Sequence, residues 1–514
     1  MSGTPAGPGT GGTQTDARIP GAETAGTADT AGTAETAGTA GTADTAGTAE
    51  TAGTAGTAGT AVRGGSPRAR ALDLTAYAAG SLGMGVWVTV PGLLLLYFMV
   101  HTLGVPVSLA GLTLLLPKAI DVLVHPLLGT LSDREARRTG HRRGMLRWGL
   151  LLAAAMAAMF TVPAGLTGPA AALWVGGWYI AGNVLFASFQ VPYLTTPSDL
   201  RVGYHERTRV FMFRMLLLTL GLLGAGVAAP ALAASGERGD YSRMALLLAG
   251  FMVVSGLVAL RGVRRLTETC GFRMPDRRDH STLADVRAAL GDRDFRALAL
   301  SYLFTSTTTH LFLAALPFYT EYVFHDTGLT ALLMGCFLGP AVVAGPAWQQ
   351  ASRRIGKQRG LLAAQGVFIA GSLALLFGEM LGVAATVVVV VFLGTAFAGL
   401  QLLAFSMVPD TVAAAEAAQG SARAGAYTGV WTATDATGTA VGPYVYSAVL
   451  AVGGFVSTTG GTAVAQPDSA LTALVAGFTL VPAALMAVAV AFQSRYALDR
   501  TAGAHQATGI VSRP

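Results

Sequence analysis

Long apolar segments alternate with short polar loops over most of the chain. Twelve of these segments are long enough to cross a bilayer, since a spanning helix needs roughly 20 residues at about 1.5 Å rise each. Inside lipid only helices or closed barrels satisfy the backbone, and runs this long and apolar are typical of helices. The predicted helices cover about residues 73–101, 107–131, 146–166, 170–195, 211–235, 243–261, 295–319, 328–349, 360–381, 384–409, 424–453 and 468–493.

The first 62 residues have a different pattern. From about Ala25 to Ala61 the unit Thr-Ala-Gly recurs, with occasional Asp or Glu. Such a segment has almost nothing to bury, so it cannot offset its chain entropy. We predict that residues 1–62 are a disordered, passive tail.

The positive charges lie in every second loop. Arginines fill the loops after the second, fourth, sixth and eighth segments, while the other loops are short and carry few. The positive-inside rule places the basic loops and both termini in the cytoplasm of a plasma-membrane protein. The long basic loop divides the chain into an N-terminal half (63–262), the loop itself (263–294), a C-terminal half (295–493) and a cytoplasmic tail (494–514).

Composition agrees with lipid as the solvent. The chain is 52% apolar and 12% charged, whereas soluble proteins are about a quarter charged. The net charge of +6 does not indicate a nucleic-acid partner, because the basic residues lie in short loops rather than on one soluble face. No metal-binding motif and no Ser/His/Asp set is evident, so we expect neither an enzyme nor a cofactor.

One stretch carries a family signature. Gly129-Thr130-Leu131-Ser132-Asp133-Arg134, followed by Gly140-His141-Arg142-Arg143, resembles the loop after the second helix of major facilitator proteins. The Asp-x-x-x-x-Pro-x-x-Gly pattern ahead of it resembles the glycoside–pentoside–hexuronide:cation symporter family. Stretches 191–214, 340–357, 407–425 and 438–455 agree, so the resemblance covers about 73–493. It implies an all-α membrane protein with twelve helices in two six-helix halves, which rock around a midplane site.

A charged group lies halfway along the second predicted helix. Lys118, Asp121 and His125 share one helical face, and a carboxylate at that depth costs about 3 kcal/mol. Lys118 could simply neutralise Asp121, but we favour a cation or proton site. In the resembling family the residue at 121 is a cation ligand, and its partner carboxylate stands where His125 is here. Sodium prefers several oxygen ligands and a histidine can carry a proton, so the coupling ion is predicted as H⁺ rather than Na⁺.

Candidate solute ligands are spread over both halves. The family's sugar-binding Asp of helix one falls near Gly85, and its Asp of helix four is Gln190 here; its basic residue of helix eleven falls near Ala436. These departures put a galactoside substrate in doubt. Trp87 can also be a packing residue, Gln190 an interhelical partner, and His310 a hydrogen-bonded structural histidine, which is the interpretation we favour for it. Arg214 either extends to the lipid headgroups or pairs with a carboxylate on helix two, and we favour the pair. The candidates are Gln190, Tyr193, Trp87, Arg214, His310 and Asp435.

The cytoplasmic loops carry candidate gating residues. Charged pairs there would hold the outward-open state and break as the cytoplasmic side opens. Retention of single arginines by lipid phosphates is the alternative. The candidates are Asp133, Arg134, Arg142 and Arg143 in the first half, and Arg353 and Lys357 in the second.

The favoured interpretation is a secondary active transporter that works as a monomer. It would couple a cation to symport of a sugar or sugar-like solute by alternating access. An exporter of a hydrophobic or non-sugar metabolite on the same fold is one alternative. An integral membrane enzyme is another, and a channel is disfavoured by the two-half plan.

Overall fold

The computed structural model describes residues 69–274, 283–419, 424–461 and 464–498. All of them belong to one unit, Ala34–Pro514. The predicted tail 1–62 and most of the predicted tail 494–514 lie outside the described residues. The described part is almost entirely helical.

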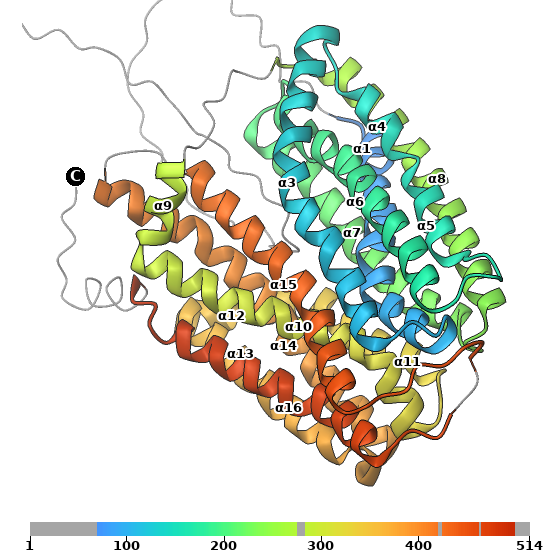
Figure 1. Cartoon of the computed structure of the whole chain (residues 1–514). Coiled ribbons are helices and arrows are strands. Elements are labelled where there is room, and N and C mark those ends of the chain that lie inside the picture. The colour runs from blue at the N-terminus through green and yellow to red at the C-terminus, as the bar shows by residue number, and fades with distance from the viewer. Residues whose placement is uncertain (1–68, 275–282, 420–423, 462–463, 499–514) are drawn as a thin grey trace, which may run out of the picture. The chain divides into compact units, whose positions relative to one another are not determined.

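The N-terminal half runs from α1 to α8 (Figure 1). The first predicted segment is helical throughout, with Ala71–Leu95 as one spanning helix, and its hydrogen-bond pattern changes at Pro91, which lacks a backbone N–H. The elements of this half are α1 (Ala71–Ala78), α2 (Gly80–Val90), η1 (Pro91–Leu95), η2 (Phe98–Thr102), α3 (Val107–Thr139), α4 (Arg143–Gly149), α5 (Leu152–Phe160), α6 (Gly168–Asp199), α7 (Tyr204–Leu232) and α8 (Arg238–Cys270).

The C-terminal half runs from α10 to α16 (Figure 1). A short helix, α9 (Leu283–Gly291), precedes it within the predicted basic loop. Asp292 caps α10, because its carboxylate accepts the backbone N–H groups of Asp294 and Phe295. The elements are α10 (Arg293–Phe324), α11 (Leu329–Val343), α12 (Gly345–Ile355), α13 (Lys357–Ala374), η3 (Leu375–Phe377), α14 (Gly378–Gln419), α15 (Ala424–Val452) and α16 (Asp468–Gln493).

Each of the twelve predicted segments falls on helical residues of the structure. By length and apolar composition alone, seven described helices could cross a membrane, or eight if the bent pair α11–α12 is one span. One of the seven, Lys357–Ala415, contains two predicted segments, and Gly382 interrupts it with a φ of 75°. Three further helices are not among the seven. The α3 stretch Val107–Lys118 counts only as a shorter apolar helix, α10 carries a run of Ser and Thr with His310, and α15 is rich in Thr and Gly and carries Asp435.

Several boundaries differ from the prediction: α3 continues to Thr139, α7 begins at Tyr204 and α14 continues to Gln419. Two cases show the reasons. The third segment was predicted to reach 166, but α5 ends at Phe160, shortly before the helix-breaking Pro163. The sixth segment was predicted to end at 261, yet α8 continues to Cys270. Its last turns are polar, and the Arg264 side chain pairs with Glu268 four residues later. A long apolar run in the sequence marks only the part of a helix that lies in the bilayer, so helical turns outside it are missed.

Close packing of α10 on α15 positions the polar centre of the C-terminal half. A Cβ at Gly442 of α15 would lie 2.6 Å from the backbone nitrogen of Leu311 and from the carbonyl oxygen of Thr307. Only glycine therefore permits this approach. The consequence is that side chains on the facing surfaces of these two helices can hydrogen bond directly.

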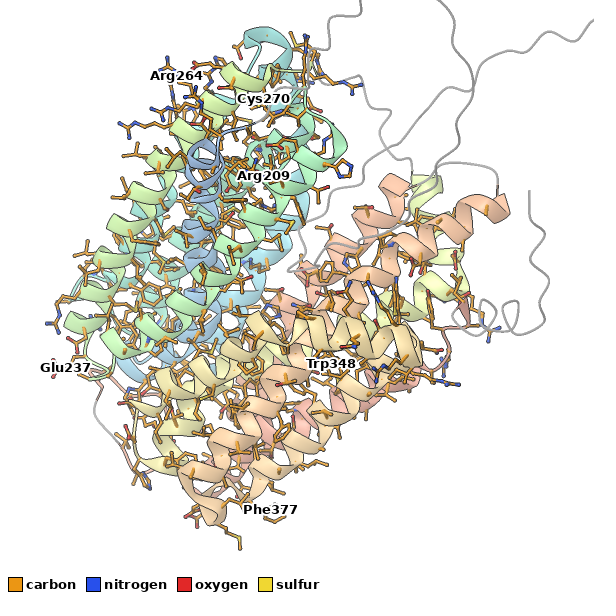
Figure 2. The ribbon with its side chains drawn as sticks, turned by 180° about the vertical axis from the view of Figure 1, so that it is seen from behind. Arg209, Glu237, Arg264, Cys270, Trp348 and Phe377 are labelled. Atoms are coloured by element: carbon orange, nitrogen blue, oxygen red, sulfur yellow. The ribbon has the colours of Figure 1, made fainter. Side chains whose placement is uncertain are left out.

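The two ends of the helices differ. One end, here called the basic end, carries the arginine-rich loops; in Figure 2, Arg264 and Cys270 mark it in the N-terminal half, and Glu237 marks the opposite end. At that opposite end the two halves are joined by hydrogen bonds, so we call it the closed end. Ser447 Oγ donates to the Val107 carbonyl at 2.6 Å, and the Thr458 N–H donates to the Val100 carbonyl at 2.9 Å.

Candidate functional site

The first part of the site lies between α3 and α6. His125 Nε2 lies 3.1 Å from Gln190 Oε1, and both side chains are half-buried. Gln190 Oε1 can only accept, so the imidazole donates from Nε2 in this arrangement. Lys118 is also half-buried and lies on the same face of α3 as His125, two turns earlier. The backbone of Asp121 lies in α3 between them, while its side chain lies outside the described residues.

The second part lies between α10, α14 and α15. The carboxylate of Asp435 accepts a hydrogen bond from Tyr302 Oη at 2.9 Å and one from Ser306 Oγ at 3.2 Å. Tyr302 Oη also lies 3.2 Å from Gln401 Oε1. The Tyr302 ring is fixed from the other side, because Trp431 stacks on it with ring centroids 4.3 Å apart. This half thus holds a carboxylate among hydroxyl and amide groups.

His310 links the two parts. Its Nδ1 lies 2.9 Å from the carbonyl oxygen of Ser306, and its Nε2 lies 3.4 Å from Thr439 Oγ1. The imidazole also has charge interactions with Asp435 and with Lys118 of the other half. Ser306 contacts both His310 and Asp435, so these two predicted residues share one hydroxyl partner.

Two aromatic candidates are packing residues in this structure. Trp87 is 2% exposed and packs against Tyr179 and Phe186 of α6. Tyr193 is fully buried, stacks on Tyr77 with centroids 4.7 Å apart, and donates its hydroxyl to the Tyr77 carbonyl. Neither ring has a face free for a solute here. For Trp87 this is the packing alternative that the sequence also allowed.

Gly85 explains one departure from the family pattern. A Cβ at this position would lie 2.6 Å from the backbone of Gly221 and Leu222 on α7. The contact between α2 and α7 therefore leaves no room for a side chain. An aspartate here would require the two helices to separate, so in this protein the position serves helix packing.

Arg214 lies inside the N-terminal half on α7. Only 3% of it is exposed, and its guanidinium lies 5.5 Å from the centroid of the Phe211 ring. The buried Nε has no hydrogen-bond partner among the described residues. Burial excludes the interpretation that the side chain extends to the headgroups in this conformation.

The predicted gating residues lie at the basic end. Arg142 is 5% exposed; its Nε donates to Asp199 at 2.6 Å, and its Nη1 donates to Asp133 at 2.6 Å. Burial lowers the pKa of Arg142, but the hydrogen bonds and charges of Asp199 and Asp133 outweigh it and raise that pKa above its usual value. Arg143 Nη1 lies 3.9 Å from Glu268.

The remaining gating candidates are more exposed. Lys357 Nζ lies 2.6 Å from Asp410 on α14, while Arg134 and Arg353 are exposed. The ion pairs that the structure describes at this end each join residues of the same half. They hold neighbouring helix ends together within a half.

A cluster that the sequence did not reveal joins the two halves at the closed end. Glu321 of α10 accepts a hydrogen bond from Tyr97 Oη at 2.6 Å, and its other oxygen lies 2.7 Å from His101 Nε2. Tyr97 stacks on His101 with centroids 4.8 Å apart. We call these three residues the latch. Glu321 lies more than 200 residues after its partners and just beyond a predicted segment, so no local pattern connects them.

Glu321→Gln is expected to weaken the closed end. Hydrogen bonds to charged groups exceed neutral ones by about 1–2 kcal/mol, so the open fraction at this end should rise roughly tenfold. The measurement is the labelling rate of Ser447→Cys by a membrane-impermeant maleimide, with Cys270 and Cys336 replaced by Ala. Ser447 is buried at the contact between the halves, so labelling reports their separation.

Glu237→Gln is the matched control for the latch. Glu237 is an exposed carboxylate at the same end and should leave the labelling rate unchanged (Figure 2). Equal rates in Glu321→Gln and the unsubstituted reporter would show that the latch does not hold the halves together.

Two hollows in the described part of the chain lie away from this polar centre. One is inside the N-terminal half and is lined by Gly80, Gly83, Met252 and Gly256 among others. The second lies beside Arg142 at the basic end. Neither involves α10 or α15, so the polar side chains rather than an enclosed hollow define the candidate site.

Comparison with known proteins decides the family. A family model described as MFS/sugar transport protein matches residues 76–500. The protein belongs to this family. The match confirms the predicted resemblance to major facilitator sugar symporters, and it places the chain among transporters rather than enzymes.

Individual relatives of the transporter are distant. An uncharacterized symporter of Synechocystis sp. is 30% identical over 147 residues, which cover 27% of each chain. The isoprimeverose transporter of Lactiplantibacillus pentosus is 24% identical over 425 residues, covering 79% of this chain and 84% of the relative. The chain thus spans about a quarter of the first relative. Further relatives carry provisional names, some as symporters or importers and some as exporters.

Solved structures confirm the fold of the transporter. The nucleoside transporter NupG superposes with a TM-score of 0.59 at 12% identity, covering 83% of this chain and 99% of that chain. Identity this low shows the fold alone. The transporter has the major facilitator fold that the two-half plan predicted.

Proposed function

We propose that the transporter couples a cation, H⁺ rather than Na⁺, to symport of a sugar or sugar-like solute across the plasma membrane. The observation that carries the proposal is the placement of titratable and hydroxyl-binding side chains at mid-helix in both halves. His125 and Gln190 lie in one half, and His310 and Asp435 in the other, with Lys118 acting across the two. The proposed working unit is the monomer.

Proton coupling is supported by the chemistry of the α3 face. Around position 121, the described neighbours supply an imidazole, an amide and an ammonium group. Sodium prefers several hard oxygen ligands, which this set does not provide. A histidine changes its charge near neutral pH, so binding and release of a proton fit these residues better.

The polar side chains of the candidate site support a hydroxyl-rich solute. Gln190 and Gln401 can each donate and accept hydrogen bonds, and the hydroxyls of Ser306 and Thr439 lie nearby. A relative named as an isoprimeverose transporter matches this chain over 425 residues, which favours a sugar as the solute.

Alternating access is supported by the difference between the two ends. The latch and backbone hydrogen bonds join the halves at the closed end, while the described ion pairs at the basic end lie within each half. With the basic end and both termini in the cytoplasm, this conformation is closed to the outside. Solute and cation binding would then shift the balance between inward-open and outward-open states.

The test is uptake by purified protein in liposomes. A panel of labelled pentosides, hexosides and uronides is offered under a pH gradient or a Na⁺ gradient of equal driving force. We expect accumulation of at least one sugar-like solute under the pH gradient only. Accumulation under the Na⁺ gradient alone would overturn proton coupling, and a failure of the whole panel would overturn the sugar assignment.

Export of a non-sugar metabolite is the second candidate. Two observations favour it: Gly85 leaves no room for the family's sugar-binding carboxylate, and some relatives are provisionally named as exporters. The same liposomes with the opposite gradient separate the candidates, because an exporter moves its solute against the proton flow.

A further inference from the structure

The hydrogen-bond partners of His310 determine where its protons are. The Ser306 carbonyl, 2.9 Å from Nδ1, can only accept, so Nδ1 carries a hydrogen in every protonation state. Thr439 donates its hydroxyl hydrogen to the Asp435 carbonyl at 2.9 Å. Its remaining lone pairs face Nε2 of His310 at 3.4 Å. Nε2 is thus the position that gains or loses a proton, and the Thr439 hydroxyl oxygen can accept a hydrogen bond from a proton there.

Asp435 has partners for both of its protonation states. When ionised, it accepts from Tyr302 at 2.9 Å and from Ser306 at 3.2 Å. When protonated, it can donate to Tyr302, whose hydroxyl hydrogen then turns to Gln401 Oε1 at 3.2 Å. Rotation of one hydroxyl replaces one arrangement by the other. A carboxyl group that only stabilises the fold stays in one protonation state and needs hydrogen-bond partners for that state alone.

The surrounding charges are few and come from both halves. Tyr302 of α10 contacts Asp435 directly, His310 of α10 lies next to it through Ser306, Gln401 of α14 contacts Tyr302, and the charge of Lys118 on α3 acts on His310. The helix α9 packs against α15 nearer its start, where Tyr427 donates to Asp292. From α16, the described residues supply no charged neighbour to this group.

We propose that the C-terminal half carries a proton-binding site of its own, in which Asp435 and His310, bridged by Ser306, hold one transported proton. The proposal rests on the proposed transport function and adds a second site to the one expected on α3. The proton forms an O–H bond at Asp435 or an N–H bond at His310 Nε2. It arrives from water on one side of the membrane and leaves to water on the other.

This site has a direct means of acting on the two halves. A proton on His310 adds a positive charge to the C-terminal half, and the charge of Lys118 on α3 acts against it. Like charges repel, so the protonated site favours separation of α3 from the C-terminal half, which α3 contacts through α15. Proton occupancy then has different free energies in the open and closed states, which is the requirement for coupling.

The first test measures the proton site without transport. Trp431, stacked on Tyr302, serves as the reporter, and its signal is the fluorescence difference between the unsubstituted protein and Trp431→Phe. We expect this signal to depend on pH and to lose that dependence in Asp435→Asn and in His310→Gln. Thr437→Val, at an exposed position of α15, is the control, and its Trp431 signal should keep the pH dependence of the unsubstituted protein.

The second test measures coupling. Under a gradient of two pH units, one proton fewer per solute lowers the accumulation ratio by about 100-fold. We expect that loss in Asp435→Asn and partial recovery in Asp435→Glu, while counterflow exchange stays within about threefold. Unchanged titration and unchanged accumulation in both variants would overturn the site. If no solute accumulates even in the unsubstituted protein, the transport proposal fails, but the fluorescence titration still decides the proton site.

Discussion

Asp121→Asn is expected to remove the contribution of the α3 site to accumulation driven by a proton gradient. Position 121 lies on α3 between Lys118, which acts on His310, and His125, which contacts Gln190 of α6. Residues three and four apart share a helical face, so an ionisable group at 121 belongs to this polar face. Asparagine keeps the shape but cannot change its charge, so it cannot bind and release the transported cation.

The expected loss is large enough to measure without ambiguity. Two pH units supply about 2.7 kcal/mol per proton, so each proton carried with the solute raises the accumulation ratio by a factor of about 100. Loss of the proton carried at the α3 site lowers the ratio by that factor. The measurement is the steady-state ratio of labelled solute in liposomes that contain equal amounts of monodisperse protein.

Asp468→Asn is the control for this substitution. Asp468 is exposed in the first turn of α16, so a protein with the same chemical change at this position should accumulate solute normally. An unchanged ratio in Asp121→Asn would remove this carboxyl group from the coupling mechanism and leave the C-terminal site as the candidate.

Arg142→Gln is expected to destabilise the N-terminal half. The guanidinium is buried between Asp199 and Asp133 and also donates to Ser132 at 2.9 Å. Removing one partner of a buried ion pair leaves an uncompensated charge, which costs about 3–5 kcal/mol. Because Asp133 is partly exposed, we expect the lower end of that range, measured as a lower unfolding midpoint of the purified protein.

Arg264→Gln provides the matched comparison. Its pair with Glu268 is also short, at 2.8 Å, but both side chains are largely exposed, so solvent already screens the charges. Its unfolding midpoint should stay close to that of the unsubstituted protein. If both substitutions have equally small effects, the Arg142 cluster does not stabilise the helix ends.

The helix order could be predicted because its causes are local. Each spanning segment needs its own apolar length, and each basic loop its own charges, so both are visible in consecutive residues. The overlong prediction after Phe160 and the early end given to α8 arose where lipid no longer determines the sequence. Helices outside the bilayer follow hydrogen bonding and charge pairing instead.

The candidate site could be predicted only in part. Lys118, His125, His310 and Asp435 were evident because polar groups are expensive in the middle of an apolar helix. Trp87 and Tyr193 carried no comparable signal, since an aromatic residue suits both a binding face and a packed interface. Their surroundings depend on helices that are distant in the sequence.

The sequence by itself determined the membrane-spanning architecture, the family and the helix faces on which polar groups lie. Only the tertiary structure decided which polar groups meet: Tyr302 and Ser306 with Asp435, Glu321 with Tyr97 and His101, and Arg142 with Asp199. The reason is physical. Partition into lipid acts on each segment separately, whereas a hydrogen bond or ion pair depends on how two segments are packed, and glycines such as Gly85 and Gly442 set that packing through contacts with helices far along the chain.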